Sequence, residues 1–254
     1  MAEGIWQECD GAKLIRRLTA RAWRAVEAQH VISTRKLVDS DAEQQLLEEL
    51  IDRSKPRLAR SAELGRLHYL LSTPFRYPPL PHGSRFGTRA EMGIWYGAEN
   101  QRTLFAEIAY YRLLFLEGTR AELPVLLVEL TAFVAPLRTH KGIDLTRAPF
   151  SAHTARISSK TSYSVSQRLG TDMRATGVEA FRFRSARDPE GGSNLGVFRP
   201  AAFASRRPAA LETWLSVTTR NVVEISRKDF FRKQTFRFER ELFCVRGKLP
   251  SAAV

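Results

Sequence analysis

The stretch Gly93-Ile-Trp-Tyr-Gly-Ala-Glu-Asn-Gln-Arg-Thr-Leu-Phe-Ala-Glu-Ile-Ala-Tyr110 joins two different patterns of periodicity. Gly93–Gly97 is short, aromatic and flanked by glycines, which is typical of a strand. A helix is predicted over residues 100–117, with Gly118 as its stop signal. Within that helix, apolar side chains recur at helical spacing at Leu104, Ile108, Tyr111 and Phe115. A strand followed directly by an amphipathic helix indicates a mixed core of helices and strands.

The rest of the second half of the chain is mostly strand-like. Residues 178–184 alternate between apolar and charged side chains, which predicts a strand with one solvated face. A second helix is predicted over residues 167–176, ended by Gly177. Further strands are predicted at residues 124–131, 194–198, 221–225, 235–238 and 242–245. The predicted fold class is therefore α+β.

The first 73 residues differ from the rest in periodicity and charge. Apolar residues recur at helical spacing around Trp23 and again after Asp41, so residues 12–72 predict two or three helices. A proline-rich segment then ends this helical part. Residues 1–73 hold 12 Lys+Arg and 11 Asp+Glu, whereas residues 74–254 hold 28 and 16. The sequence therefore predicts a near-neutral helical N-terminal extension followed by a basic domain.

Composition limits the class of protein. The chain has 254 residues, a formal net charge of +13 at pH 7 and 43% hydrophobic residues. It can bury a sizeable core, so general disorder is excluded. The basic excess favours a partner or substrate with negative charge: nucleic acid, an acidic membrane surface or a phosphate-bearing molecule. Charge alone does not choose among these.

Several classes of protein are disfavoured. No apolar run is long enough for a transmembrane helix, and the N-terminus lacks the pattern of a secretory signal, so a cytoplasmic protein is predicted. Cys9 and Cys244 are the two cysteines and form no CxxC pair, which excludes a disulfide framework and a cysteine-based zinc site. The five histidines form no HxxxH or HExxH pair, so no metal is predicted. The GxGxxG and Walker patterns are absent.

Arg85 lies in an unusual local context. It sits between Gly83 and Gly87, just before the predicted strand. Glycines let the backbone approach a ligand closely, and a guanidinium can bind a phosphate through two parallel hydrogen bonds. The simpler alternative is an arginine on a solvated turn.

Glu107 lies at the edge of the apolar stripe of the predicted helix. Its carboxylate would be partly desolvated there, and either a cationic partner or a catalytic role would account for that. The simpler alternative is a glutamate paired with Arg102 or Arg112.

Ser185 marks the end of the predicted strand 178–184 and begins a glycine-rich loop that runs to Asn194. Strand ends commonly carry functional side chains. The simpler alternative is a polar hairpin turn. No histidine and aspartate partners lie near Ser185 in the sequence, so a Ser-His-Asp hydrolase is poorly supported.

Together these segments resemble the RES domain, a family named for an arginine, a glutamate and a serine. Those three residues match Arg85, Glu107 and Ser185, and Tyr96 matches a tyrosine usual in the intervening strand. The resemblance covers about residues 74–205, with the remainder of 74–254 as a strand-containing tail. It rests on five ordered segments: Ser84–Gly87, Gly93–Glu99, Thr103–Tyr110, Gly177–Arg187 and Asn194–Pro200.

The resemblance implies a fold and a function. RES proteins are similar in fold to ADP-ribosyltransferases, so it implies an NAD+-binding catalytic domain with a mixed sheet. They are toxins of bacterial type II toxin–antitoxin pairs that act on NAD+, either degrading it with water or phosphate or transferring ADP-ribose to a protein. The implied partner is an antitoxin with an Xre-like helix-turn-helix domain that blocks the toxin site, and the complex can be oligomeric. No cofactor is implied beyond NAD+ as substrate.

The resemblance also implies residue roles. Glu107 would stabilise the positive charge that develops on the ribose when nicotinamide leaves. Arg85 would bind the pyrophosphate, and Tyr96 would offer an aromatic face to a ring of NAD+. Ser185 would hydrogen-bond the ribose or position Glu107. Arg187 and Asn194 are weaker candidates for phosphate or ribose contacts.

Two readings from other classes stay open. A nucleic-acid-binding module could use the basic charge together with phenylalanines that stack on bases, namely Phe181, Phe183, Phe230, Phe231, Phe236 and Phe238. Alternation of phenylalanine with arginine is also what any amphipathic strand shows, so direct nucleic-acid binding is disfavoured. The other reading is a non-catalytic interaction protein with a degenerate pocket, which the presence of all three named residues weakens.

Overall fold

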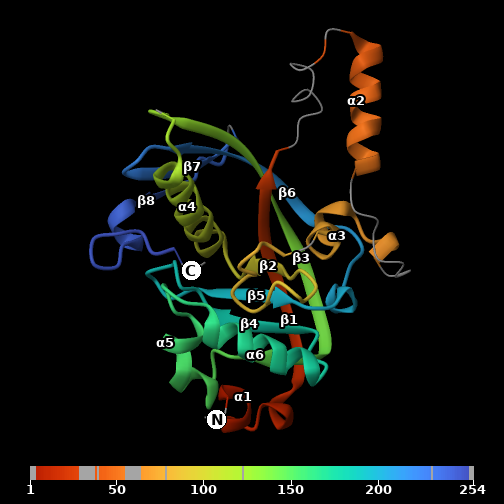
Figure 1. The fold of residues 1–254 in the computed structure, drawn as a ribbon, viewed down its shortest axis with the longest axis vertical. Helices are drawn as coiled ribbons and strands as arrows, with labels where there is room; N and C mark the ends of the chain where they lie inside the picture. Colours follow the sequence, from red (N-terminus) through yellow and green to blue (C-terminus); the bar gives the residue numbers. More distant parts are fainter. Residues whose placement is uncertain are drawn as a thin grey trace.

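The computed structural model describes residues 4–28, 38, 40–54, 64–77, 79–121, 123–229 and 231–251. In these ranges, eight strands form one mixed sheet that helices cover (Figure 1). The strands are β1 (Arg16–Glu27), β2 (Trp95–Ala98), β3 (Leu126–Asp144), β4 (Ala180–Arg184), β5 (Ser193–Val197), β6 (Ala209–Thr218), β7 (Val222–Arg227) and β8 (Thr235–Glu239). The helices are α1 (Ile5–Glu8), α2 (Asp41–Ser54), α3 (Tyr69–Arg76), α4 (Gln101–Gly118), α5 (Thr154–Ile157) and α6 (Ser164–Ala175). The predicted α+β class is confirmed.

The sheet closes on itself over part of its width. Its strand order is β1-β2-β5-β4-β3-β6-β7-β8, and β1 also pairs with β3. The first five strands therefore form a ring, while β6, β7 and β8 extend the sheet beyond it. Only a long strand can serve three neighbours, and β3 pairs with β1, β4 and β6 along its 19 residues. The pairing of β3 with β4 is parallel, and the other described pairings are antiparallel.

Strand β1 corrects the prediction of a helix around Trp23. It pairs antiparallel with β3 from Arg16 to Glu27, so it belongs to the sheet that carries the rest of the fold. The helical expectation fails because the second half of the strand, residues 22–26, is covered on both faces, whereas Arg17, Thr19 and Arg21 in the first half are exposed. Leu18 and Ala22 join one core cluster, whereas Trp23 packs against a second cluster that includes α4. A strand covered on both faces has no clean alternation of apolar and polar residues.

The end of α3 also differs from expectation, because Pro74 lies inside the helix and the helix continues to Arg76. A proline has no N–H, so the carbonyl of Leu70, four residues earlier, loses its helical donor. The indole Nε1 of Trp95 donates to that carbonyl over 3.4 Å instead. This contact ties α3 to β2. The predicted helix after Asp41 corresponds to α2 and is confirmed.

The C-terminal part contains one missed strand and one wrong prediction. Strand β6 was not predicted, because two of its buried positions are polar: Ser216 and Thr218 are fully buried and lie 3.4 Å apart through their hydroxyls. Residues 242–245 were predicted as a strand, but residues 240–243 form a 3₁₀ turn. The turn buries the Phe243 side chain in the core. The strands predicted near β2, β3, β4, β5, β7 and β8 are confirmed, as are the helices corresponding to α4 and α6.

Helix α4 packs beside the sheet and contacts β1, β2, β5, β6, β7 and β8 (Figure 1). The helix is capped at its N-terminus by Asn100, whose side chain accepts from the Thr103 amide over 2.8 Å. The buried face does not coincide with the predicted stripe, because Tyr111 and Phe115 are more than half exposed. The side chains that fill the core are instead Phe105, Ala109, Leu113 and Leu116. This rotation turns Glu107, Ile108 and Tyr111 toward a cavity rather than into the core.

Candidate active site

A cavity of about 660 Å³ opens between α4, β1, β2 and the segment before β2. This volume lies within the range of small-molecule binding sites. Its walls combine cations, aromatic rings and one carboxylate. The polar and aromatic residues that matter most are Arg24, Arg85, Tyr96, Glu107, Tyr163 and Asn194.

Glu107 supplies the carboxylate. Its Oε1 accepts a hydrogen bond from Ser185 Oγ and another from Asn194 Nδ2, each over 2.6 Å. Among the described residues, no donor binds Oε2. The alternative that Glu107 pairs with a neighbouring arginine is wrong, because Arg112 binds Glu27 and Arg102 binds Glu190. The carboxylate is therefore fixed by neutral donors, with one oxygen left available to a ligand.

Strand register brings the two donors together. Asn194 lies on β5 opposite Phe183 of β4, and Ser185 follows directly after β4. The Ser185 amide donates to the carbonyl of Gly192 over 2.8 Å, which closes the loop between the strands. Asn194 lines the cavity, whereas Ser185 is not among the lining residues and contacts Glu107 from outside the cavity wall.

Arg85 lies in a tight turn that is closed by an isolated antiparallel β-bridge between Ser84 and Gly87. The turn begins at Gly83, which has φ of +73°, and a Cβ there would lie 2.2 Å from the Gly87 carbonyl oxygen, so glycine is required. The Arg85 side chain is buried, donates to the Ser159 carbonyl over 2.7 Å and stacks on Tyr163. It is not the solvated turn arginine of the simpler alternative, and it lines the cavity.

Tyr96 connects this turn to β2. Its hydroxyl lies 2.9 Å from Ser84 Oγ and accepts from the Phe86 amide over 3.1 Å. Burial raises the pKa of Tyr96 to about 12, so the phenol keeps its proton at neutral pH. The tyrosine thus lines the cavity and contacts the residues on either side of Arg85, the Ser84 side chain and the Phe86 amide.

Arg187 occupies a different place from the one predicted for a phosphate-binding group. Its guanidinium stacks on the ring of Tyr110, 3.5 Å from the ring centroid, and donates to the Lys160 carbonyl over 3.1 Å. Only 2% of the residue is exposed, and it lies outside the residues that line the cavity.

Three cavity residues were missed by sequence reasoning. Arg24 lies on β1, and its Nη1 donates to the Tyr96 carbonyl over 2.7 Å. Burial lowers the pKa of Arg24 to about 10, so it stays charged at neutral pH. Tyr111 and Tyr163 face each other, with their hydroxyls 3.2 Å apart. The pKa of Tyr111 is raised, because its hydroxyl end is desolvated at the cavity wall, although the residue as a whole is half exposed, and because it lies beside Tyr163 and Glu107. Arg24 was missed because the residues around Trp23 were predicted as a helix and not as the strand β1.

In the described ranges, no group of three or more histidine, cysteine, aspartate or glutamate side chains is placed to hold a metal ion. No helix of the described part of the chain is long and apolar enough to cross a membrane.

Comparison with protein families identifies the chain. A family model for the RES domain matches residues 57–218, which is more than half of the sequence. The chain therefore belongs to the RES domain family. The matched region contains Arg85, Glu107 and Ser185, but not Arg24. No curated protein sequence matches the chain. RES domains are associated with toxin–antitoxin systems and with NAD-related activity.

Proposed function

We propose that this RES domain cleaves the bond between nicotinamide and ribose in NAD+ and acts as a toxin by degrading NAD+. The observation that carries the proposal is the Glu107 carboxylate, held by Ser185 and Asn194 at the wall of a cavity that also contains two arginines. A fixed carboxylate and separate cations suit a substrate that has a pyrophosphate and develops positive charge elsewhere.

The chemistry assigned to Glu107 is electrostatic. When the bond breaks, its electron pair leaves with nicotinamide, and positive charge develops on the anomeric carbon and the ring oxygen. A preorganised carboxylate stabilises that charge more than water can, because its dipolar surroundings need not reorganise. Ser185 and Asn194 hold Oε1, so Oε2 can face the ribose. Water or phosphate then attacks the anomeric carbon and loses a proton to solvent, giving ADP-ribose or its phosphate ester.

The remaining cavity residues would bind the substrate. Arg85 and Arg24 would contact the pyrophosphate, since a guanidinium matches the geometry of two phosphate oxygens. Tyr96 and Tyr163 offer aromatic faces to nicotinamide or adenine. In this account Asn194 acts through Glu107, and Arg187 supports the cavity through Tyr110.

The products of labelled NAD+ test this proposal. Purified protein is incubated with NAD+ in buffer, in buffer with phosphate and in cell lysate, and the labelled species are separated. Release of nicotinamide with ADP-ribose or its phosphate ester supports degradation. Label transferred to a lysate protein would show a protein ADP-ribosyltransferase instead. Intact NAD+ in all three mixtures would refute both activities.

The proposed partner is an antitoxin with an Xre-like helix-turn-helix domain that covers the cavity mouth. The support is the association of RES domains with toxin–antitoxin systems. Expression without such a partner should arrest growth and deplete cellular NAD+, and co-expression of the partner should restore both. Growth arrest at normal NAD+ levels would point to protein modification.

The structure gives little support to the nucleic-acid alternative. Phe181, Phe183 and Phe238 are buried in the core and cannot stack on bases. The neighbouring arginines are engaged as well: Arg182 binds Asp144 and Glu99. Phe231 is 91% exposed, and Phe230 lies outside the described residues.

A further inference from the structure

The loop between Ser185 and Gly192 is attached to helix α4 through Glu107, Thr103 and Arg102. Ser185 Oγ donates to Glu107, and Thr103 Oγ1 donates to Asp188 Oδ2 over 2.7 Å. Thr103 and Glu107 are four residues apart on α4, so they lie on the same helix face, one turn from each other. The hydrogen bond between Thr103 and Asp188 is not part of the cavity wall, because neither residue lines the cavity.

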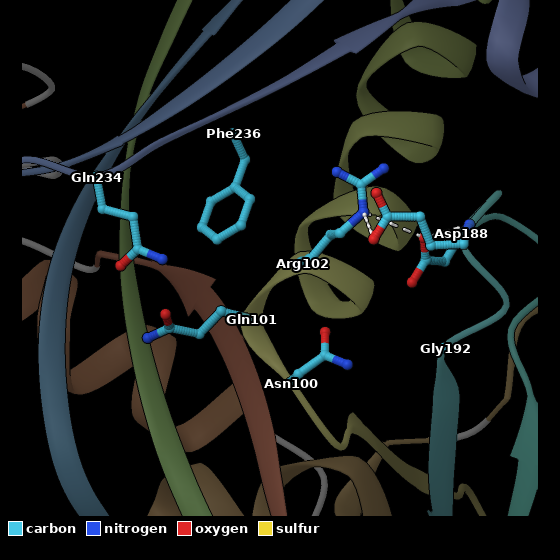
Figure 2. Close-up of a pocket in the computed structure, with 8 residues that line it drawn as sticks. Asn100, Gln101, Arg102, Asp188, Gly192, Gln234 and Phe236 are labelled. Atoms are coloured by element: carbon cyan, nitrogen blue, oxygen red, sulfur yellow. Dashed lines mark hydrogen bonds and ion pairs between the residues drawn. The ribbon is translucent and has the colours of Figure 1, made fainter.

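The Asp188 carboxylate is an internal anchor rather than a surface charge. Its side chain is 2% exposed, and Oδ1 accepts from the Glu190 amide over 3.1 Å. Arg102 and Asp188 also line a second, smaller cavity (Figure 2). There Arg102 Nε lies 3.5 Å from Asp188 Oδ1 and 2.8 Å from Glu190 Oε2. A buried carboxylate without these partners would be costly, so the contacts favour one position of the loop.

The close approach of the loop to α4 requires glycine at residue 192. A Cβ at Gly192 would lie 1.9 Å from Thr103 Oγ1 and 2.5 Å from Asp188 Oδ2. The loop can therefore approach α4 this closely only because residue 192 is glycine.

The hydrogen bonds to Ser185 show what the anchor achieves. The Ser185 oxygen accepts from the amides of Arg187 and Asp188, over 3.1 and 3.0 Å. A hydroxyl has two acceptor sites and one proton. With both acceptor sites used, the proton can only be donated, and its acceptor is Glu107 Oε1. Asp188 thus directs the Ser185 proton through its amide and fixes the loop through its carboxylate.

We infer that Thr103 and Asp188 are positioning residues for the reaction: their buried hydrogen bond holds the loop so that Ser185 orients the Glu107 carboxylate. This inference rests on the proposed function for its effect on rate. It assigns no substrate contact to either residue, so the loss of the bond should lower kcat and leave KM nearly unchanged.

Thr103→Val tests the bond with little change in shape. It removes the donor and leaves the Asp188 carboxylate short of one partner. We expect kcat for NAD+ cleavage to fall about tenfold with KM within about twofold. Thr103→Ser keeps the hydroxyl and should retain a rate close to that of the native protein.

Thr139→Val is a matched control. Thr139 is also buried and donates to a carboxylate, Glu179 Oε2, over 2.6 Å, but neither residue belongs to α4 or to the loop between Ser185 and Gly192. Thr139→Val should lower the free energy of unfolding by a similar amount without lowering kcat. An equal fall in kcat for both valine variants would overturn the inference, since general destabilisation would then explain it.

Two measurements complete the test. In a double-mutant cycle, adding Thr103→Val to Ser185→Ala should lower kcat little further, because both changes break one chain of contacts. Additive effects would contradict the inference. Amide hydrogen exchange at Arg187 and Asp188, measured by NMR, should be faster in Thr103→Val than in Thr139→Val. Exchange needs no activity: if the native protein leaves NAD+ intact, the proposed function fails, while unchanged exchange alone overturns the positioning role.

Discussion

Arg24 Nη1 donates to the main-chain carbonyl of Tyr96 over 2.7 Å, which places a residue from outside the matched RES region inside the cavity. The Nε of Arg24 is buried and has no hydrogen-bond partner among the described residues. A buried guanidinium with unused donors is suited to an anionic ligand. Strand β1 therefore contributes to the proposed site as well as to the sheet.

Arg24→Met tests that contribution. Methionine keeps much of the apolar contact with Trp95 and removes the charge. We expect KM for NAD+ to rise about tenfold while kcat changes by less than about threefold, because the lost contact is remote from the bond that breaks. Arg21→Met, on an exposed position of the same strand, should behave like the native protein. An unchanged KM in Arg24→Met would refute the substrate contact.

Tyr96→Phe tests the link between the tyrosine and the Arg85 turn. The change removes the acceptor of the Phe86 amide and the contact with Ser84. Arg85 should then be less well oriented, so KM should rise about five- to tenfold with a smaller effect on kcat. Tyr77→Phe, at a position 42% exposed, is the control. A fall in kcat alone would assign Tyr96 to the chemical step instead.

Asp144 and Arg182 predict a pH-dependent contribution to stability. Burial by itself would raise the pKa of Asp144, but hydrogen bonds from Thr146 and Arg182 outweigh it and hold this pKa below 3.8. A depressed carboxyl pKa stabilises the fold above the unfolded pKa, and that stability is lost as the pH falls through the folded value.

Arg182→Met should therefore lower the free energy of unfolding by about 1 kcal/mol at pH 7 and by less at pH 3. Urea titrations at both pH values measure the difference. Arg237→Met removes the exposed pairs with Glu224 and Glu239 and should have a smaller effect. The same loss at pH 3 and pH 7 would show that the effect of Arg182 is packing rather than charge.

The elements that carry the named site residues were largely predictable from the sequence. Helical spacing and the stop signal at Gly118 located α4, and the alternation of phenylalanine with arginine located β4. Both are short-range patterns that the structure preserves, with Phe181 and Phe183 buried and Arg184 exposed. Glu107, Asn194 and Ser185 meet because β4 and β5 pair in register beside α4.

The missed features depend on long-range contacts. Whether Trp23 lies on a helix or a strand is settled by pairing with Val134, more than 100 residues away. The sequestration of Arg187 by Tyr110 likewise follows from tertiary packing, since neither residue has a local signal for the other. The direction of the Ser185 proton could not be predicted either, because it depends on the positions of the Arg187 and Asp188 amides in the folded loop.

The most direct test of the central claim is NAD+ turnover by purified Glu107→Gln. Glutamine keeps an oxygen that can accept from Ser185 and Asn194 but loses the negative charge, so the fold should remain intact. Glu117→Gln, the same change on the same helix outside the cavity, is the control. We predict a fall in kcat of about 100- to 1,000-fold for Glu107→Gln and a native rate for Glu117→Gln. Native NAD+ turnover by folded Glu107→Gln would contradict the account.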